Sequence, residues 1–411
     1  MIVPYLILCA IGIVMVYSAS SNVAVENGTT PSAYLVRQAF WVVIGLGITI
    51  FMTAMNTRYL HYKQFYWIGM ILLDCVLIWL LAAGKTINGA SGWISFGPIN
   101  IQPAEFVKFF LIVATASRLG RRSDEKPMLS GHWWGINAKP IILSAFMIGL
   151  VLVQPDMGSA VIITGILVMM YLGSGFSYKL MLAIVGSGIA FYFCVLLPIM
   201  FKIGKATNVS NYKLARIVAF VDPFGHQSGS GLQLVNSYYA ISNGGLFGVG
   251  LGNSIQKRGY LPEPNTDFIM SIISEELGLI GIIIILCLLA FIVCRAIYIG
   301  IHSENTFNIM VCYGVATYFA LQAFVNIGGV VGFLPITGVT FPFISYGGSS
   351  MMSLTLCLGL LINVSAQEKN CKKKGAVNNA GNSRKRRFSR LRVQFKTGTA
   401  IKTVWARCVR F

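Results

Sequence analysis

The region that decides the fold is Arg258-Gly-Tyr-Leu-Pro-Glu-Pro-Asn-Thr-Asp-Phe-Ile-Met-Ser-Ile-Ile-Ser-Glu-Glu-Leu-Gly278. Its first half is rich in proline and polar residues, and its second half begins an apolar run long enough for a membrane helix. Asp267 therefore lies where a water-exposed loop becomes an apolar helix. An acidic residue at such an edge of a membrane is a candidate for function.

Composition places the whole chain in the membrane class. Of its 411 residues, 55% are hydrophobic and 11% are charged, which excludes a soluble globule with a polar surface. Apolar runs near the ~20 residues of a membrane helix predict an all-α polytopic membrane protein with about ten transmembrane helices. The runs are 2–18, 39–55, 65–83, 104–117, 140–154, 157–173, 180–198, 268–294, 307–331 and 349–365.

The distribution of basic residues predicts the topology. Short loops on one side are rich in Lys and Arg, whereas the other side has only Arg37 and Lys85 in short loops, so both termini should be cytoplasmic. The long loop between helices 7 and 8, about residues 199–266, is basic as well. A loop longer than ~60 residues is translocated despite its charges, so we expect it outside.

The net charge of +19 comes mainly from the C-terminal end. After Glu368 there are 14 Lys or Arg and no acid, so only 18 of the 32 basic residues oppose the 13 acids before that point. We predict a membrane domain over residues 1–368 and a disordered basic cytoplasmic tail over 369–411. Such a tail contacts anionic inner-leaflet lipids, and nucleic acid is not needed to explain it.

Cysteine and histidine give no sign of a metal or disulfide framework. The nine cysteines lie in apolar segments or in the tail without a Cys-x-x-Cys pair, and the four histidines are not near Asp267 in the sequence. No cofactor is therefore predicted with a dedicated site. Carboxylates and an anionic substrate leave Mg²⁺ or Mn²⁺ open as a cation held through oxygen ligands.

Two further stretches place charges beside apolar helices. Pro103 is expected to open a helix in which Glu105 and Lys108, three residues apart, pair on one face. This pair is either purely structural or faces a polar cavity. Asp156 follows Gln154-Pro155 in a tight helical hairpin, where an N-terminal cap of a helix is a sufficient structural reason for it.

The segment Gly338-Val-Thr-Phe-Pro-Phe-Ile-Ser-Tyr-Gly-Gly-Ser-Ser350 combines proline with a glycine pair. Irregular backbone at membrane depth is tolerated where it is buried in protein or lines a water-filled cavity. Ser345, Gly347 and Gly348 are thus either parts of a kink or part of a cavity wall. The basic and aromatic loop before Asp267 is either a solvated surface or a surface for an anionic, amphiphilic substrate.

Four motifs together resemble the signatures of the SEDS family of bacterial membrane glycosyltransferases. They are Gly-Trp-Ile-Ser-Phe-Gly-Pro-Ile-Asn-Ile-Gln-Pro-Ala-Glu-Phe, Gln-Pro-Asp-Met-Gly, Asn-Thr-Asp-Phe-Ile with Glu275-Glu276-Leu-Gly, and Phe-Pro-Phe-Ile-Ser-Tyr-Gly-Gly-Ser-Ser. The resemblance covers residues 1 to about 368. Two loop stretches, beginning at Gly231 and Gly252, are more similar to the members that act in cell division than to those that act in elongation.

The resemblance implies polymerisation of lipid II, an undecaprenyl-pyrophosphate-linked disaccharide-pentapeptide, into peptidoglycan at the outer face of the cytoplasmic membrane, at the division septum. It also implies a class B penicillin-binding transpeptidase and other divisome membrane proteins as partners. An acid at the position of Asp267 is taken as catalytic in this family. Glu105, Lys108 and Asp156 match positions that line the same cavity.

The residues agree with that chemistry. One carboxylate can take the proton of the acceptor hydroxyl in an inverting displacement, and we assign this role of general base to Asp267. Glu275 and Glu276 would lie ~12–13.5 Å further along the helix, so we expect them to be structural. Lys108, Lys257 and Arg258 are the cations expected near the pyrophosphate. A lipid II flippase and a non-catalytic divisome scaffold remain alternatives.

Overall fold

The computed structural model of the chain consists of two compact units, Met1–Ile362 and Asn363–Phe411. The division falls within the last helix, Gly348–Asn370, and the predicted boundary at residue 368 stays a prediction. The predicted basic tail lies, from residue 371 on, outside the described residues. The structure describes residues 1–26, 28–87, 90–96, 99–120, 131–174, 178–204, 212–227 and 229–370.

Each predicted apolar run coincides with a helix, because a chain in lipid must satisfy its backbone hydrogen bonds internally. These helices are α1 (Ile2–Ala19), α3 (Pro31–Ala54), α4 (Lys63–Ala83), α5 (Pro103–Gly120), α6 (Gly131–Val153), α7 (Met157–Gly173), the continuous α8, η2 and α9 (Tyr178–Phe191, Tyr192–Leu196 and Leu197–Gly204), α12 (Ile269–Ile301), α13 (Thr306–Val330) and the last helix.

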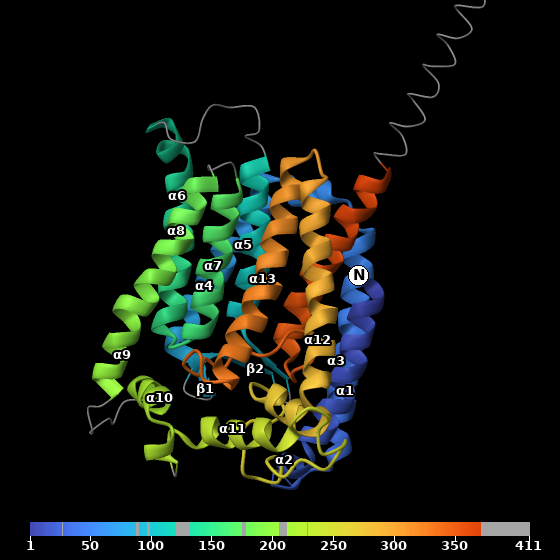
Figure 1. Ribbon diagram of the computed structural model, residues 1–411. Coiled ribbons are helices and arrows are strands. Elements are labelled where there is room, and N and C mark those ends of the chain that lie inside the picture. Colours follow the sequence, from blue (N-terminus) through green and yellow to red (C-terminus); the bar gives the residue numbers. More distant parts are fainter. Residues whose placement is uncertain are drawn as a thin grey trace, which may run out of the picture. The chain divides into compact units, whose positions relative to one another are not determined.

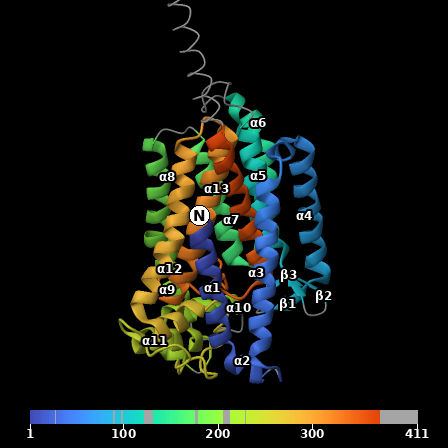
Figure 2. The same ribbon diagram turned by 90° about the vertical axis from the view of Figure 1, so that its right-hand side faces the viewer.

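Length and composition qualify six of the described helices as membrane-crossing, and three shorter apolar helices accompany them. The helices stand side by side in the first unit, as Figures 1 and 2 show. The predicted all-helical, polytopic membrane architecture is thereby confirmed, whereas the number of ten spans stays a prediction. Helix α13 packs against α5, α7 and α12 and forms the centre of the bundle.

One end of the bundle carries the shorter elements (Figures 1 and 2). They are α2 (Ser21–Glu26), α10 (Tyr212–Val221), η3 (Phe224–His226), α11 (Leu232–Gly244) and the strands β1 (Lys85–Ile87), β2 (Ala90–Phe96) and β3 (Ile99–Ile101), while η1 (Thr57–His61) precedes α4. The strands form an antiparallel sheet in the order β1-β2-β3, with Ser95 opposite Asn100. This sheet was not expected from the sequence.

The predicted outer loop of residues 199–266 is wrong in one respect. The preceding helix continues to Gly204, and much of the region that follows is helical or packed against the bundle. Gly244 makes this packing possible, because a Cβ there would lie 1.9 Å from the carbonyl oxygen of Ser274. Close backbone approach of this kind cannot be inferred from hydropathy, which describes only the average environment of a segment.

A glycine also sets the distance between α3 and the last helix. A Cβ at Gly348 would lie 2.4 Å from the indole ring of Trp41, which is itself buried. We expect Gly348→Ala to destabilise the folded protein by about 1–3 kcal/mol, since a rigid buried ring cannot move away without cost. Denaturant titration of the detergent-solubilised protein measures this change.

Gly47 provides the matched control, because it lies in α3 and a Cβ there meets no atom within 4 Å. Gly47→Ala should leave stability unchanged or raise it slightly, since alanine favours a helix more than glycine does. Equal midpoints for Gly348→Ala and Gly47→Ala would contradict the packing described for Trp41.

Candidate functional site

Asp267 occupies the junction that the sequence predicted. Helix α12 begins at Ile269, and the residues before it form a turn in which Glu263 accepts hydrogen bonds from the backbone of Thr266 and Phe268. The hydroxyl of Thr266 also donates to the Glu263 carboxylate at 2.8 Å. The turn therefore presents Asp267 just outside the apolar helix.

Asn326 of α13 fixes the backbone of this turn. Its side-chain amide donates to the carbonyl oxygens of Asp267 and Val339, both at 2.7 Å. One amide thus joins the start of α12 to the irregular segment before the last helix. These groups line a narrow pocket formed by Asp267, Phe268, Val325, Asn326, Gly329, Val330, Ile336, Thr337, Gly338 and Val339.

Arg216 of α10 is the cation that this arrangement brings to the pocket. Its guanidinium donates to the carbonyl oxygen of Ile336 at 3.3 Å. A Cβ built on Gly338 would lie 3.4 Å from the carboxylate of Asp267 and 3.7 Å from the Arg216 guanidinium. Asp267 and Arg216 therefore border the same glycine, although they are 51 positions apart in the chain.

The surroundings of Asp267 raise the pKa of its carboxyl toward neutral pH. Burial is the main cause that raises the pKa of this carboxyl from 3.8 to about 7, and the negative charge of Glu263 adds to it. The positive charge of Arg216 lowers the pKa, and the negative charge of Asp156 raises it. A carboxyl with this pKa exchanges protons near neutral pH, as a general base must.

Glu105 and Lys108 form the ion pair that their spacing predicted. The Lys108 ammonium lies 2.6 Å from the Glu105 carboxylate at the start of α5, and both side chains are buried. Tyr318 of α13 donates to the other oxygen of Glu105 at 3.2 Å, and its ring lies 5.3 Å from the Lys108 nitrogen. The pair is therefore closed off by α13.

Asp156 caps α7, as its position in the hairpin predicted. Its carboxylate accepts from the backbone N–H of Ser159 at 2.9 Å and from the side-chain amide of Gln102 at 2.6 Å. Both oxygens thus have donors from the protein. The hairpin between α6 and α7 is confirmed, and the bond to Gln102 ties it to the start of α5.

The three residues that we singled out in the motif before the last helix are not the ones that line the pocket. The Ser345 hydroxyl accepts from the backbone N–H of Phe341 at 2.7 Å and so closes a local turn. Gly348 packs against Trp41. The residues of this segment that line the pocket are Thr337, Gly338 and Val339, ahead of Ser345, Gly347 and Gly348.

Lys257 lies elsewhere than expected. Its ammonium is buried, 2.6 Å from the Glu276 carboxylate and 2.8 Å from the Ser18 hydroxyl. Its charge is thereby neutralised within the protein, which corrects the expectation that it meets a pyrophosphate. Arg258, the next residue, is exposed.

Glu275 and Glu276 have the structural role that their distance from Asp267 predicted. Glu275 accepts from the Ser254 hydroxyl and from the backbone N–H groups of Ile255 and Gln256, at 3.1 and 3.2 Å. Together with the ion pair of Glu276, these bonds hold the loop that leads to Asp267 against α12.

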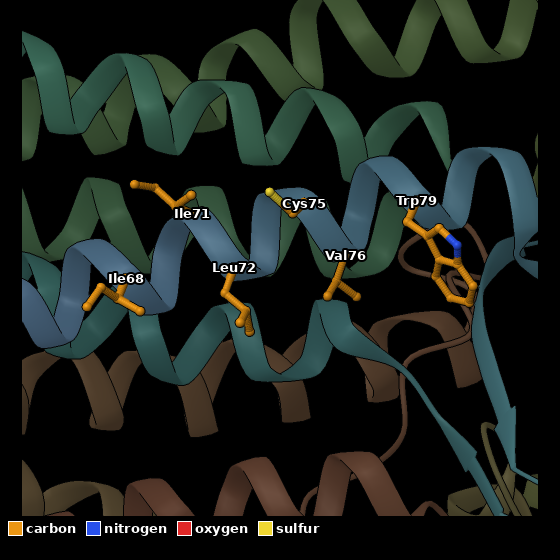
Figure 3. A pocket seen from close by; sticks show the side chains of 6 residues that line it. All are labelled: Ile68, Ile71, Leu72, Cys75, Val76 and Trp79. Carbon is orange, nitrogen blue, oxygen red and sulfur yellow. The ribbon is translucent and has the colours of Figure 1, made fainter.

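A second, apolar groove has none of these features. Figure 3 shows its six lining side chains on α4, namely Ile68, Ile71, Leu72, Cys75, Val76 and Trp79. It contains no acid or base and so offers nothing for proton transfer. Among the residues that the structure describes, no three His, Cys, Asp or Glu side chains gather as a metal site.

Comparison with known sequences identifies the family. Residues 1–370 match the FtsW/RodA/SpoVE family of cell cycle proteins. The chain belongs to this family. It is similar to a protein of Bacillus subtilis named "Probable peptidoglycan glycosyltransferase FtsW", with 40% identity over 368 residues that cover 89% of either chain. Stage V sporulation protein E of the same organism is 35% identical over 370 residues, 89% of this chain and 96% of that protein.

Solved structures share the fold. A chain from the structure of a peptidoglycan synthase complex has a TM-score of 0.68 and 22% identity, over 89% of this chain and 97% of that chain. Thermus thermophilus rod shape determining protein RodA has a TM-score of 0.59 and 24% identity, over 89% of this chain and 96% of that one. The helical arrangement is thus that of the SEDS membrane proteins.

The ion pair of Lys257 and Glu276 gives a test of the loop anchor. Glu276→Gln leaves a buried ammonium without its counter-charge, so we expect it to cost about 3–5 kcal/mol of stability. The double variant Lys257→Met/Glu276→Leu removes both charges and should be more stable than Glu276→Gln. Urea or detergent unfolding measures the stability of the wild type, of Glu276→Gln and of the double variant.

Arg258→Met is the matched control, because Arg258 is next to Lys257 in the sequence but carries an exposed charge. It should change stability by no more than about 0.5 kcal/mol, as surface substitutions usually do. An equal loss in Glu276→Gln and Arg258→Met would contradict the buried ion pair.

Proposed function

We propose that this protein is a peptidoglycan glycosyltransferase that polymerises lipid II at the outer face of the cytoplasmic membrane. Family membership and the names of relatives at 35–40% identity support the activity. The observation that carries the proposal is Asp267, a carboxyl with a pKa of about 7 that borders a pocket beside a guanidinium.

In the proposed reaction, Asp267 removes the proton from the hydroxyl of the acceptor sugar. The hydroxyl oxygen forms a bond with the anomeric carbon of the donor, and the bond from that carbon to the pyrophosphate oxygen breaks with inversion. The undecaprenyl pyrophosphate leaves with the electron pair. One base is sufficient, because the leaving group is already a stable anion and needs positive charge more than a proton.

Arg216 supplies positive charge beside Asp267. It is fixed by the carbonyl of Ile336, and it opposes the rise of the Asp267 pKa that burial causes. A preorganised cation at a partly buried site stabilises developing negative charge more strongly than one in bulk water. We therefore assign Arg216 the role that was expected for Lys108, Lys257 and Arg258. Lys108 is held in its own ion pair deeper in α5.

The proposed topology follows from charge. Both termini are cytoplasmic, so the end of the bundle that carries α10 and α11 faces outward, where lipid-linked sugars polymerise (Figure 1). Asp267 borders the same glycine as Arg216 of α10 and therefore lies at this end. The relatives named FtsW support a place at the division septum. Localisation of a fluorescent fusion at the septum or along the side wall decides between division and elongation.

The proposed partner is a class B penicillin-binding transpeptidase. Support comes from the chain of similar fold that was solved within a peptidoglycan synthase complex. The polymerisation assay is therefore run with and without the transpeptidase. Separate arms with Mg²⁺, Mn²⁺ and EDTA address the divalent cation that the sequence left open.

Asp267→Asn tests the assignment of the base. The amide keeps the shape of the side chain but cannot accept the proton, so polymer formation from lipid II should fall at least about 10²-fold. Gel analysis of labelled glycan strands, with folding checked by thermal unfolding, measures this effect.

Asp222→Asn is the matched control, since Asp222 is an exposed acid on the same side of the bundle whose carboxylate accepts a local backbone bond from Gly225. It should keep wild-type activity. Full polymerisation by Asp267→Asn would overturn the assignment of Asp267 as the base. If the wild type formed no polymer, transport of labelled lipid II across liposomes would favour a flippase, and intact partner assembly without either activity would favour a scaffold.

The pH profile tests Arg216. The rate of the wild type should fall about tenfold per unit as pH drops below about 7, because protonation of Asp267 removes the base. Arg216→Gln removes a charge that lowers the Asp267 pKa, so the inflection should move to higher pH while the maximal rate drops.

Arg216→Lys restores the charge and should return the inflection toward that of the wild type. Lys202→Gln removes an exposed charge and serves as the control. If Arg216→Gln lowered the rate equally at every pH and left the inflection unmoved, the electrostatic coupling to Asp267 would be wrong.

A further inference from the structure

Helix α12 changes its environment at Gly278. The residues from Ile269 to Glu276 are buried, whereas the outer faces of the following turns are exposed. The exposed fractions are 46% for Leu279, 44% for Ile280, 50% for Ile283 and 51% for Ile284. Residues 279–301 span about 35 Å at 1.5 Å each, close to the ~30 Å of a hydrocarbon core. Gly278 therefore lies about where a hydrocarbon core that surrounds residues 279–301 would end.

A loop is joined to the helix at this edge. Gly278 has a φ of +70°, which interrupts the helix and leaves backbone groups for other partners. The N–H groups of Leu279 and Ile280 donate to the carbonyls of Gly245 and Leu246, at 3.0 and 3.2 Å. In return, the N–H groups of residues 249 and 250 donate to the carbonyls of residues 275 and 276, at 2.9 and 3.0 Å.

Four large apolar side chains of this loop point away from the protein. Leu246 is 60% exposed, Phe247 80%, Val249 39% and Leu251 57%. We call residues 246–251 the apolar loop. Its backbone is fixed by the bonds to α12, so these side chains cannot turn inward to bury themselves. A fixed, exposed apolar cluster of this kind is a mark of an interaction surface.

The chemistry of the surrounding chain identifies the occupant. Residues 245–256 contain no ionisable side chain, and the next one, Lys257, is buried in an ion pair. The apolar loop is hydrogen-bonded to the first residues of the lipid-facing surface of α12, so the two surfaces are continuous. Apolar side chains at the edge of the hydrocarbon are stabilised by entering the headgroup and acyl boundary.

We propose that the apolar loop inserts into the bilayer leaflet on the Asp267 side of the membrane, next to the outer end of α12. The insertion fixes the height of the segment that runs from Leu246 to Asp267. The pocket is thereby held at the membrane surface rather than above it. This inference does not depend on the proposed function, because lipid contact is measured without substrate.

The test places a fluorophore in the loop of the full-length protein. Phe247→Trp is reconstituted in phosphatidylcholine nanodiscs, with ordinary lipids or with lipids brominated on the acyl chains, and the emission of the seven native tryptophans is subtracted. The added emission should fall by more than half in the brominated lipids and should resist quenching by aqueous iodide. Leu246→Trp repeats the measurement should Phe247→Trp fail to fold.

Gln227→Trp is the control, since Gln227 is a polar, exposed residue between α10 and α11. Its added emission should be quenched by iodide and not by the brominated lipids. The proposal is overturned if the loop variants behave like Gln227→Trp. Iodide quenching of the loop that disappears only when the transpeptidase is added would also overturn it, in favour of a protein contact.

Discussion

A charge taken out of water must be neutralised, and this constraint organises the polar interior of the protein. Lys108 is neutralised by Glu105, and Lys257 by Glu276, each at 2.6 Å. Each acid also accepts a hydrogen bond from a hydroxyl, Glu105 from that of Tyr318 and Glu276 from that of Ser18. A buried ion is tolerated only when its remaining lone pairs or protons are satisfied in this way.

The same constraint applies to Asp267, but here it favours the protonated carboxyl instead of an ion pair. Burial favours its protonated form, and the nearby charges of Glu263 and Arg216 act in opposite directions. The carboxyl therefore titrates near neutrality instead of being held permanently ionised. In the two ion pairs each charge has its counter-charge within the protein. Asp267 instead keeps a reactive proton equilibrium at the edge of the same bundle.

Precise placement of Asp267 requires that the loop before it be held firmly. Glu275 and Glu276 perform this task by accepting bonds from the loop, and Asn326 fixes the turn itself. These acids do not act on substrate in our proposal, yet the position of the proposed base depends on them. The apolar loop adds an attachment to the bilayer, so protein and lipid together set the height of the pocket.

The sequence by itself determined the features that depend on local spacing. Hydropathy located the long apolar helices, the i, i+3 spacing paired Glu105 with Lys108, and the Gln154-Pro155 turn placed Asp156 as a cap. Such features need only neighbouring residues, because helix geometry brings them together.

Only the tertiary structure decided which distant groups meet. Arg216, Asp267 and Ile336 come from three separate parts of the chain, and no periodicity relates them. The sequence suggested that Lys257 was available to a substrate, whereas the structure places it against Glu276 and Ser18. The partner of a charge is set by the packing of whole helices, and in this protein that packing separates the structural ion pairs from the proposed base.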